Sequence, residues 1–326
     1  MAFPRNSLIT LGFMVLFGAT GCGGDDSSPG GGSGGGGTGG TGGGSGGTSG
    51  AGAAAGSGGG TFQCDPGPGY SGSVATQKVD SLDGKVVDLD GNPAPKTVTT
   101  VCGLSLCIFG STDDQGVVVT CDNQTSICSP GIAPNVDMKK PAFKYALGLN
   151  YAKFALLLPA GKSVHDVGTQ VTARFPDFSA GSDLVAGQES SSAGVTVRLA
   201  AGTDIKFEPD FITSEEKRFR AVEIPMAKAP EAVDKSLGFD GVVATTPVDT
   251  DFCPFADLSL PNNYGYAAGD DVEIWIHGVD PEEAWAPYGG WGKVSDAKVS
   301  SDGTRIETVA GQGIPMLGNF GIRKKP

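Results

Sequence analysis

Histidine, the side chain that most often carries out acid–base chemistry near neutral pH, is scarce in this chain. Only His165 and His277 are present, and they lie far apart in the sequence. The H-E-x-x-H pattern of zinc proteases and the glycine-rich phosphate loop with its Gly-Lys-Ser/Thr end are both absent. Because general acid–base catalysis most often uses histidine, we predict no catalytic residues and no enzymatic activity. A hydrolase with an unrecognised site is the remaining alternative.

Metal-ligand patterns are also lacking. Structural zinc sites usually need two close ligand pairs of the C-x-x-C or H-x-x-x-H kind, and no such pair is present. The stretch 88–92 has the oxygen density of a calcium loop but lacks the distal glutamate of an EF-hand. An Asp-Gly sequence forms a β-turn without any ion. We therefore interpret 88–92 as a turn and predict no metal and no cofactor.

Positive charge is in short supply. The chain has 23 Lys and Arg against 36 Asp and Glu, a formal net charge of −13. Such a chain repels the phosphates of nucleic acids. We therefore expect no nucleic-acid partner, and we attribute most of the acidity to solubility.

No apolar run is long enough to cross a bilayer as a helix. The longest, residues 8–17, would rise only ~15 Å as a helix, about half of a ~30 Å hydrocarbon core. It follows a single cation, Arg5, and precedes the small residues 18–21 and then Cys22. A cation, a short apolar stretch and small residues are typical of a cleaved signal peptide. We therefore predict a signal peptide over 1–21.

The residues 18–22 resemble the lipobox of bacterial lipoproteins. The resemblance implies that Cys22 receives a diacylglycerol, becomes the new N-terminus and is acylated, for example by palmitate. Gly23 in place of aspartate implies the outer membrane or cell surface. Acyl chains alone give ample membrane affinity, so the expected membrane partner is reached through the lipid anchor. Ordinary cleavage with a free thiol at residue 22 is the alternative. Removal of Arg5 with the signal leaves a net charge of 22 − 36 = −14.

Glycine dominates the segment that follows. Residues 23–60 contain 22 glycines in 38 residues, with serine, threonine and alanine making up most of the rest. Glycine loses the most backbone entropy on ordering and has no side chain to bury. We therefore predict that 22–60, including the lipidated cysteine, is a disordered tether with an r.m.s. span of roughly 30–37 Å.

Six cysteines remain when Cys22 is set aside, an even number that fits three disulfides in an oxidising compartment. Sequence alone does not choose among the possible pairings. Short loops favour local pairs, which predicts the pairing Cys102–Cys107, Cys121–Cys128 and Cys64–Cys253.

Short β-branched runs separated by turn residues fill the chain from residue 61 onward. Asp-Gly turns between such runs are typical of hairpins. Val195, Val197 and Leu199 alternate with polar residues, as expected for a strand with one buried face. Val272, Ile274 and Ile276 do the same. We therefore predict an all-β fold with two β-sandwich-like domains after the tether, spanning 61–162 and 163–326.

The stretches 84–88, 90–95, 97–98 and 111–117 follow the order G-x-V-x-D, G-x-P, a strand and T-D-x-x-G. This pattern, over about 80–120, resembles the carboxypeptidase-regulatory-like domain. The resemblance implies a small transthyretin-like β-sandwich without catalytic residues, here over 61–162.

The C-terminal part resembles ZU5-type β-domains of bacterial surface proteins. The matching stretches are 260–263, 268–274, 291–294, 299–303 and 311–314. Some ZU5 proteins cleave themselves at a His-Phe-Ser triplet. This chain has Asn319-Phe320-Gly321 instead, without the base and the hydroxyl, so no self-cleavage is predicted.

Aromatic residues gather between residues 264 and 291, where all three tryptophans of the chain lie. Exposed aromatic faces stack on sugar rings or anchor protein partners. This predicts a non-catalytic binding or adhesion module for polysaccharide or a surface protein. The alternatives are that both strand faces are covered, or that loop aromatics close the end of a sandwich. A structural envelope component without a small ligand is the alternative function. The candidate ligand-binding residues are Trp275, Trp285, Tyr288 and Trp291.

Overall fold

Strands make up nearly all the regular structure. The computed structural model describes residues 67–70, 74–122, 124–147, 149–208 and 213–326. Within these ranges it has strands β1 to β22 and three short 3-10 turns, η1 (Phe178–Ala180), η2 (Met226–Lys228) and η3 (Lys235–Leu237). The prediction of an all-β fold is confirmed. The predicted signal peptide, Cys22, the tether and Cys64 lie outside the described residues. No helix in the described ranges is long and apolar enough to span a bilayer.

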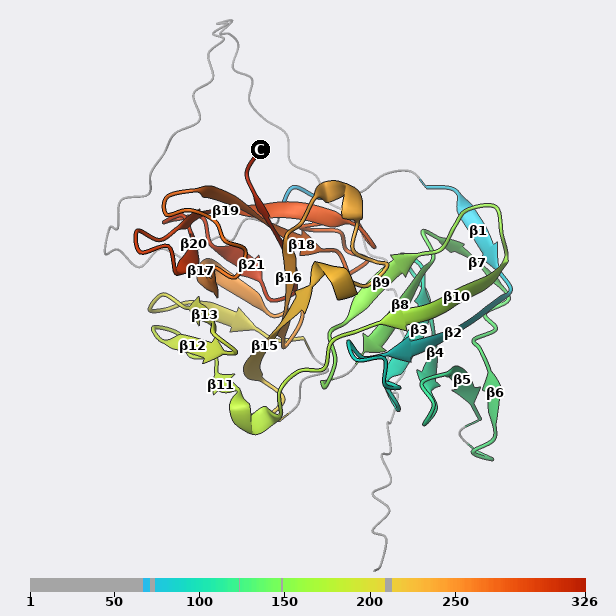
Figure 1. The fold of residues 1–326 in the computed structure, drawn as a ribbon. Helices are drawn as coiled ribbons and strands as arrows, with labels where there is room; N and C mark the ends of the chain where they lie inside the picture. Colours follow the sequence, from blue (N-terminus) through green and yellow to red (C-terminus); the bar gives the residue numbers. More distant parts are fainter. Residues whose placement is uncertain (1–66, 71–73, 123, 148, 209–212) are drawn as a thin grey trace, which may run out of the picture. The chain divides into compact units, whose positions relative to one another are not determined.

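The N-terminal strands form a β-sandwich (Figure 1). One layer is a six-stranded antiparallel sheet in the order β6-β5-β4-β3-β8-β9, and the other consists of the pairs β1–β7 and β2–β10. Leu82 and Val86 of β2 share one core with Phe143 and Tyr145 of β8. The bounds are β1 Thr76–Val79, β2 Ser81–Val87, β3 Val98–Cys102, β4 Cys107–Thr112, β5 Val118–Cys121, β6 Cys128–Pro130, β7 Val136–Lys139, β8 Ala142–Leu147, β9 Phe154–Leu157 and β10 Val164–Val171.

Strand β10 lies just beyond the predicted boundary at residues 162 and 163. It pairs in parallel with β2, from Val164 opposite Ser81 to Val171 opposite Val87, and Figure 1 shows the two strands side by side. Hydrogen bonding therefore joins residues 164–171 to the N-terminal sandwich. All the described residues belong to one compact unit, and the division of the sequence into two domains stays a prediction.

The Asp-Gly turns form as the sequence predicts. The Asp88 carboxylate accepts hydrogen bonds from the backbone N–H groups of Asp90 and Asn92, both at 2.9 Å. Asp113 does the same for Gln115 and Val117. These carboxylates satisfy the backbone of a tight turn, a role that does not involve an ion.

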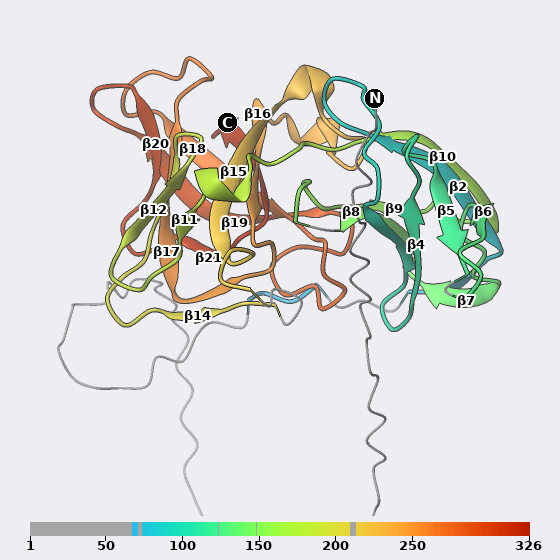
Figure 2. The ribbon, with the colours of Figure 1, turned by 90° about the horizontal axis from the view of Figure 1, so that it is seen from below.

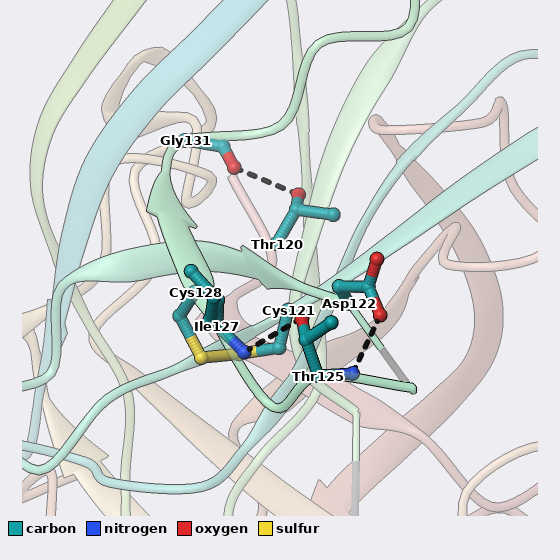
Figure 3. Close-up of a disulfide and its surroundings, with 7 residues drawn as sticks. All are labelled: Thr120, Cys121, Asp122, Thr125, Ile127, Cys128 and Gly131. Carbon is teal, nitrogen blue, oxygen red and sulfur yellow. Dashed lines mark hydrogen bonds between the residues drawn. A yellow bond between two sulfur atoms is a disulfide. The ribbon is translucent and has the colours of Figure 1, made fainter.

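Two disulfides each close a hairpin in the six-stranded sheet. Cys102–Cys107 joins opposite residues of β3 and β4, and Cys121–Cys128 joins opposite residues of β5 and β6. Figure 3 shows the second hairpin, in which the Thr125 N–H donates to the Asp122 carboxylate. Both predicted local pairs are confirmed. Cys253 is also disulfide-bonded, and its expected partner, Cys64, lies outside the described residues.

The C-terminal strands form a twelve-stranded sheet that nearly closes on itself. Ten strands follow the order β11-β15-β16-β22-β18-β19-β20-β17-β13-β12, and β14 and β21 pair with β17. At the two ends of this order, β12 lies beside β11 and β15 (Figure 2). Serine side chains join the ends, because Ser182 Oγ accepts from the Ser191 N–H and Ser192 Oγ accepts from the Ala221 N–H. The bounds are β11 Ser182–Asp183, β12 Glu189–Ser192, β13 Val195–Arg198, β14 Asp204–Lys206, β15 Arg218–Pro225, β16 Gly241–Thr246, β17 Asp251–Pro261, β18 Asp271–His277, β19 Trp291–Val299, β20 Arg305–Thr308, β21 Ile314–Met316 and β22 Asn319–Lys324.

The alternation of apolar and polar residues in the sequence correctly predicts which side chains lie in the core of this sheet. Val195, Val197 and Leu199 lie in it, and so do Val272, Ile274 and Ile276 of β18. Trp275, on the opposite face of β18, packs instead against the core that includes the N-terminal strands. Both faces of β18 are therefore covered.

Candidate functional site

A pocket of about 430 Å³ opens among the ends of several strands of the C-terminal sheet. Its walls come from β14, the start of β17, the end of β18 with the loop that follows it, and the segment 315–318. Seven carboxylates line it, from three separate stretches of the chain: Asp204 and Glu208, Asp249 and Asp251, and Asp280, Glu282 and Glu283. Among the described residues, Lys206 is the one lysine or arginine in the lining.

An aromatic wall bounds the same pocket. The rings of Trp285 and Phe255 meet edge to face, with centroids 5.3 Å apart and an interplanar angle of 84°. Both side chains are only half-buried, whereas Phe252, also in the lining, is fully buried. The pocket therefore combines an apolar surface with several acidic groups, a combination typical of binding sites.

Two of the acidic residues are held by lysines from the N-terminal sandwich. Lys153 Nζ lies 2.6 Å from Asp249 Oδ2, and Lys140 Nζ lies 2.5 Å from Glu283 Oε1. Glu283 also accepts the backbone N–H of Tyr288 at 2.8 Å. Asp249 and Glu283 both have positive φ angles, 61° and 54°, a conformation uncommon for residues other than glycine. The ion pairs therefore fix two strained loop positions that shape the pocket.

The described chain begins at the rim of this pocket. The N–H of Gly69 donates to Ala284 O at 3.2 Å, and the N–H of Tyr70 donates to Glu283 O at 3.1 Å. Gly67 has a φ of 83°, and a Cβ there would lie 2.4 Å from Ala284 O. Only glycine fits at this close approach. The segment 67–70 therefore lies directly on the loop that carries Glu283 and Trp285.

The negative charge of the pocket is incompletely neutralised. Burial raises the pKa of Asp251, and the nearby charges of Asp249 and Asp280 raise it further, against the opposing effect of Lys206. Lys206 Nζ is 3.6 Å from Asp251 Oδ2 and is itself largely exposed. Burial is the main cause of the raised pKa of Asp251, and the charges of Asp249 and Asp280 add to it.

His277 lines the pocket, but both nitrogens of its ring contact backbone groups of the protein. Its Nε2 accepts the Ala155 N–H of β9 at 3.1 Å, and its Nδ1 lies 2.9 Å from Gly290 O, which assigns the proton to Nδ1. Burial lowers its pKa from 6.5 to about 4. The ring is therefore neutral near pH 7 and links β18 to the N-terminal sheet. His165 is also buried, and burial lowers its pKa as well.

We expect the stability of the fold to fall in acid because of His277. Its folded-state pKa of about 4 lies below the reference value of 6.5, so the unfolded chain takes up this proton first. The contribution is complete above pH 6.5 and falls by about 1.4 kcal/mol per pH unit down to pH 4, about 3 kcal/mol in all. Urea unfolding between pH 4 and 8 measures it, with His277→Gln as the non-titrating variant. Parallel stability curves for the two proteins would contradict this assignment.

The structure does not bring the four predicted ligand-binding aromatics into one exposed patch. Tyr288 and Trp291 are 1% and 7% exposed, and both donate to backbone carbonyls, those of Cys102 and Ala232. Trp275 is half-buried and packs against Phe239 and Arg323. Only Trp285 lines the pocket. Tyr288 and Trp291 therefore agree with the alternative interpretation of the aromatic cluster, in which its side chains are covered by the fold.

The sequence gives little sign of the acidic pocket. In the sequence, Asp249 and Asp251 fit an ordinary acidic turn. Asp280, Glu282 and Glu283, near Trp285, suit either the hydroxyls of a sugar or a solvated loop. Their convergence depends on the pairing of β14 and β21 with β17, which no local pattern reveals. Nothing in the sequence indicates that Lys153 forms an ion pair at the pocket, because its partner Asp249 lies 96 residues away.

Comparison with protein-family models, curated proteins and solved structures finds no match for this chain. The resemblances to the lipobox, to the carboxypeptidase-regulatory-like domain and to ZU5 domains therefore stay predictions from the sequence.

Proposed function

We propose that this protein is an exported lipoprotein, anchored in the cell envelope through Cys22, whose β-sheet body serves as a non-catalytic binding module at the outer membrane or cell surface. The observation that carries the proposal is the oxidised state of the body's cysteines. Cys102–Cys107 and Cys121–Cys128 are disulfides, and Cys253 is disulfide-bonded too. Such bonds persist outside the reducing cytosol, which agrees with the signal and lipobox pattern of residues 1–22.

The binding role rests on the pocket. Its volume of about 430 Å³ lies in the ~300–1,000 Å³ range of ligand sites, and it joins an aromatic wall to polar groups. The acidic lining favours a protein ligand over the anionic polysaccharides of cell envelopes, since like charges repel. The two histidines are both buried, with lowered pKa values, which leaves neither suited to act as a general base near neutral pH.

Mass spectrometry of the native protein tests the proposed export and lipidation. We expect a mature N-terminus at an acylated Cys22 and no free thiol among the remaining cysteines. Cys22→Ala should move the protein from the detergent phase to the aqueous phase, whereas Ser27→Ala, a matched change in the predicted tether, should leave it anchored. An unlipidated residue 22 together with reduced thiols would overturn the proposal, and turnover of a glycan or peptide by the purified protein would overturn its non-catalytic part.

A further inference from the structure

We propose that the acidic pocket binds an organic cation, an ammonium or guanidinium group, seated between the Trp285–Phe255 wall and the carboxylates of Asp204, Asp251 and Asp280. The inference deepens the proposed binding role, since it names the chemistry of the ligand. It does not depend on the lipid anchor.

The carboxylates are spread around the pocket rather than gathered at one point, and this favours an organic cation over a metal ion. The acidic residues reach the pocket from three stretches of chain and line a space of about 430 Å³. The described residues contain no group of three His, Cys, Asp or Glu side chains placed to hold one metal ion. A cation that fills a volume and contacts carboxylates on several sides therefore suits the site better than a small ion, which needs several oxygens at one point.

Lys153 and Lys140 neutralise the back of the pocket, and the exposed Lys206 lies 3.6 Å from Asp251, so the described carboxylates at the mouth outnumber the cations there. Lys153 and Lys140 pair with Asp249 and Glu283, which are 6% and 4% exposed. Asp204 and Glu282 are exposed, and Asp280 is half-buried. The Asp280 carboxylate accepts a hydrogen bond from the backbone N–H of Glu282, through Oδ1 at 3.0 Å. A positive group that enters from solvent would thus meet carboxylates at the mouth before it reaches the buried ion pairs.

The aromatic wall is the second, independent feature that points to a cation. Trp285 is half-buried in the pocket lining, and its ring is held edge to face by Phe255. Tryptophan is the best aromatic partner for ammonium and guanidinium groups, and the attraction grows when the cation is partly desolvated. Carboxylates alone attract any cation, whereas an indole ring in the same lining favours one with an organic, weakly hydrated surface.

Calorimetric titration of the full-length mature protein in neutral detergent tests the proposal. The probes are a lysine-rich peptide, an arginine-rich peptide, spermidine and Mg²⁺. We expect saturable, one-to-one binding of at least one organic cation at physiological salt. The peptide and spermidine arms distinguish a segment of a protein partner from a free polyamine. Binding of Mg²⁺ alone, or of none of the probes, would overturn the proposal.

Matched charge variants locate the binding site. The double variant Asp204→Asn/Asp280→Asn should weaken binding by about tenfold or more, and Trp285→Leu should weaken it without any change of charge. Asp257→Asn/Glu307→Gln removes the same charge from a groove on β17 and β20 and should leave the affinity within about twofold. An equal loss in both double variants would overturn the proposal, because it would show long-range attraction by the acidic protein as a whole. Thermal unfolding of each variant checks that its fold is intact.

Discussion

Replacement of Lys153 by methionine should lower the free energy of unfolding by about 3–5 kcal/mol, because it leaves the Asp249 carboxylate buried without its cation. Asp249 is 6% exposed, and Lys153 Nζ is its ion-pair partner at 2.6 Å. The backbone carbonyl of Lys153 also accepts the Asn319 side-chain N–H at 2.6 Å, so the main chain here stays tied to β22 when the side chain changes. Urea unfolding near pH 7 measures the loss.

Two further variants show whether burial is the cause. Lys153→Met combined with Asp249→Leu should recover much of the stability, because no uncompensated charge then remains. Lys298→Met removes one side of an exposed pair with Asp271 at 2.6 Å, and exposed pairs contribute about 0–1 kcal/mol. A loss at Lys153 no larger than that at Lys298 would show that the Lys153–Asp249 pair is solvated in solution.

Replacement of Arg220 by methionine should cost about 4 kcal/mol. Arg220 is fully buried on β15, and its guanidinium donates to Pro176 O at 3.0 Å and to Leu149 O at 2.5 Å. It also stacks on the Phe178 ring, with Cζ 4.0 Å from the ring centroid. The change leaves two inward-facing carbonyls without donors, at about 1–3 kcal/mol each, and removes the stacking.

The lysine variant separates charge from geometry. Arg220→Lys keeps the charge but loses the planar fork that reaches both carbonyls, so it should rescue little of the loss. Arg198→Met, at an exposed pair with Glu189, is the matched control, with an expected change below about 1 kcal/mol. Full stability in Arg220→Met would mean that water replaces the guanidinium and that the segment 174–181 is held by other contacts.

Local sequence patterns predicted the features that depend on residues close together in the sequence, namely the buried faces of strands and the hairpin disulfides. Alternation placed Val272, Ile274 and Ile276 in the core because a strand has only two faces, and short loops correctly predicted the two hairpin disulfides. Alternation also put Trp275 on the opposite face. It could not show that Phe239 and Arg323 cover that face, because both come from distant stretches of the chain.

Features built from distant segments could not be predicted. The parallel pairing of β10 with β2 joins residues about eighty positions apart, and the pocket joins residues 204–208 to residues 280–286. Of the four predicted ligand-binding aromatics, only Trp285 lines the acidic pocket. Tyr288 and Trp291 are buried and donate to Cys102 O and Ala232 O, which are far away in the sequence. The sequence showed that residues 280–283 are acidic, but it did not show that they lie beside residues 204–208 and 249–251 in one pocket.

The contact of residues 67–70 with residues 283–284 has a mechanical consequence for an anchored molecule. With the predicted Cys64–Cys253 disulfide formed, a pull on the predicted tether enters the body at Cys253 of β17. It then reaches the loop that carries Glu283 and Trp285, through the bonds of Gly69 and Tyr70, and both places lie in the wall of the acidic pocket. If a ligand held in the acidic pocket is pulled away from the envelope, load passes from the pocket wall to the predicted anchor over a few residues and bypasses the N-terminal sandwich. The N-terminal sandwich would then carry little of the tension.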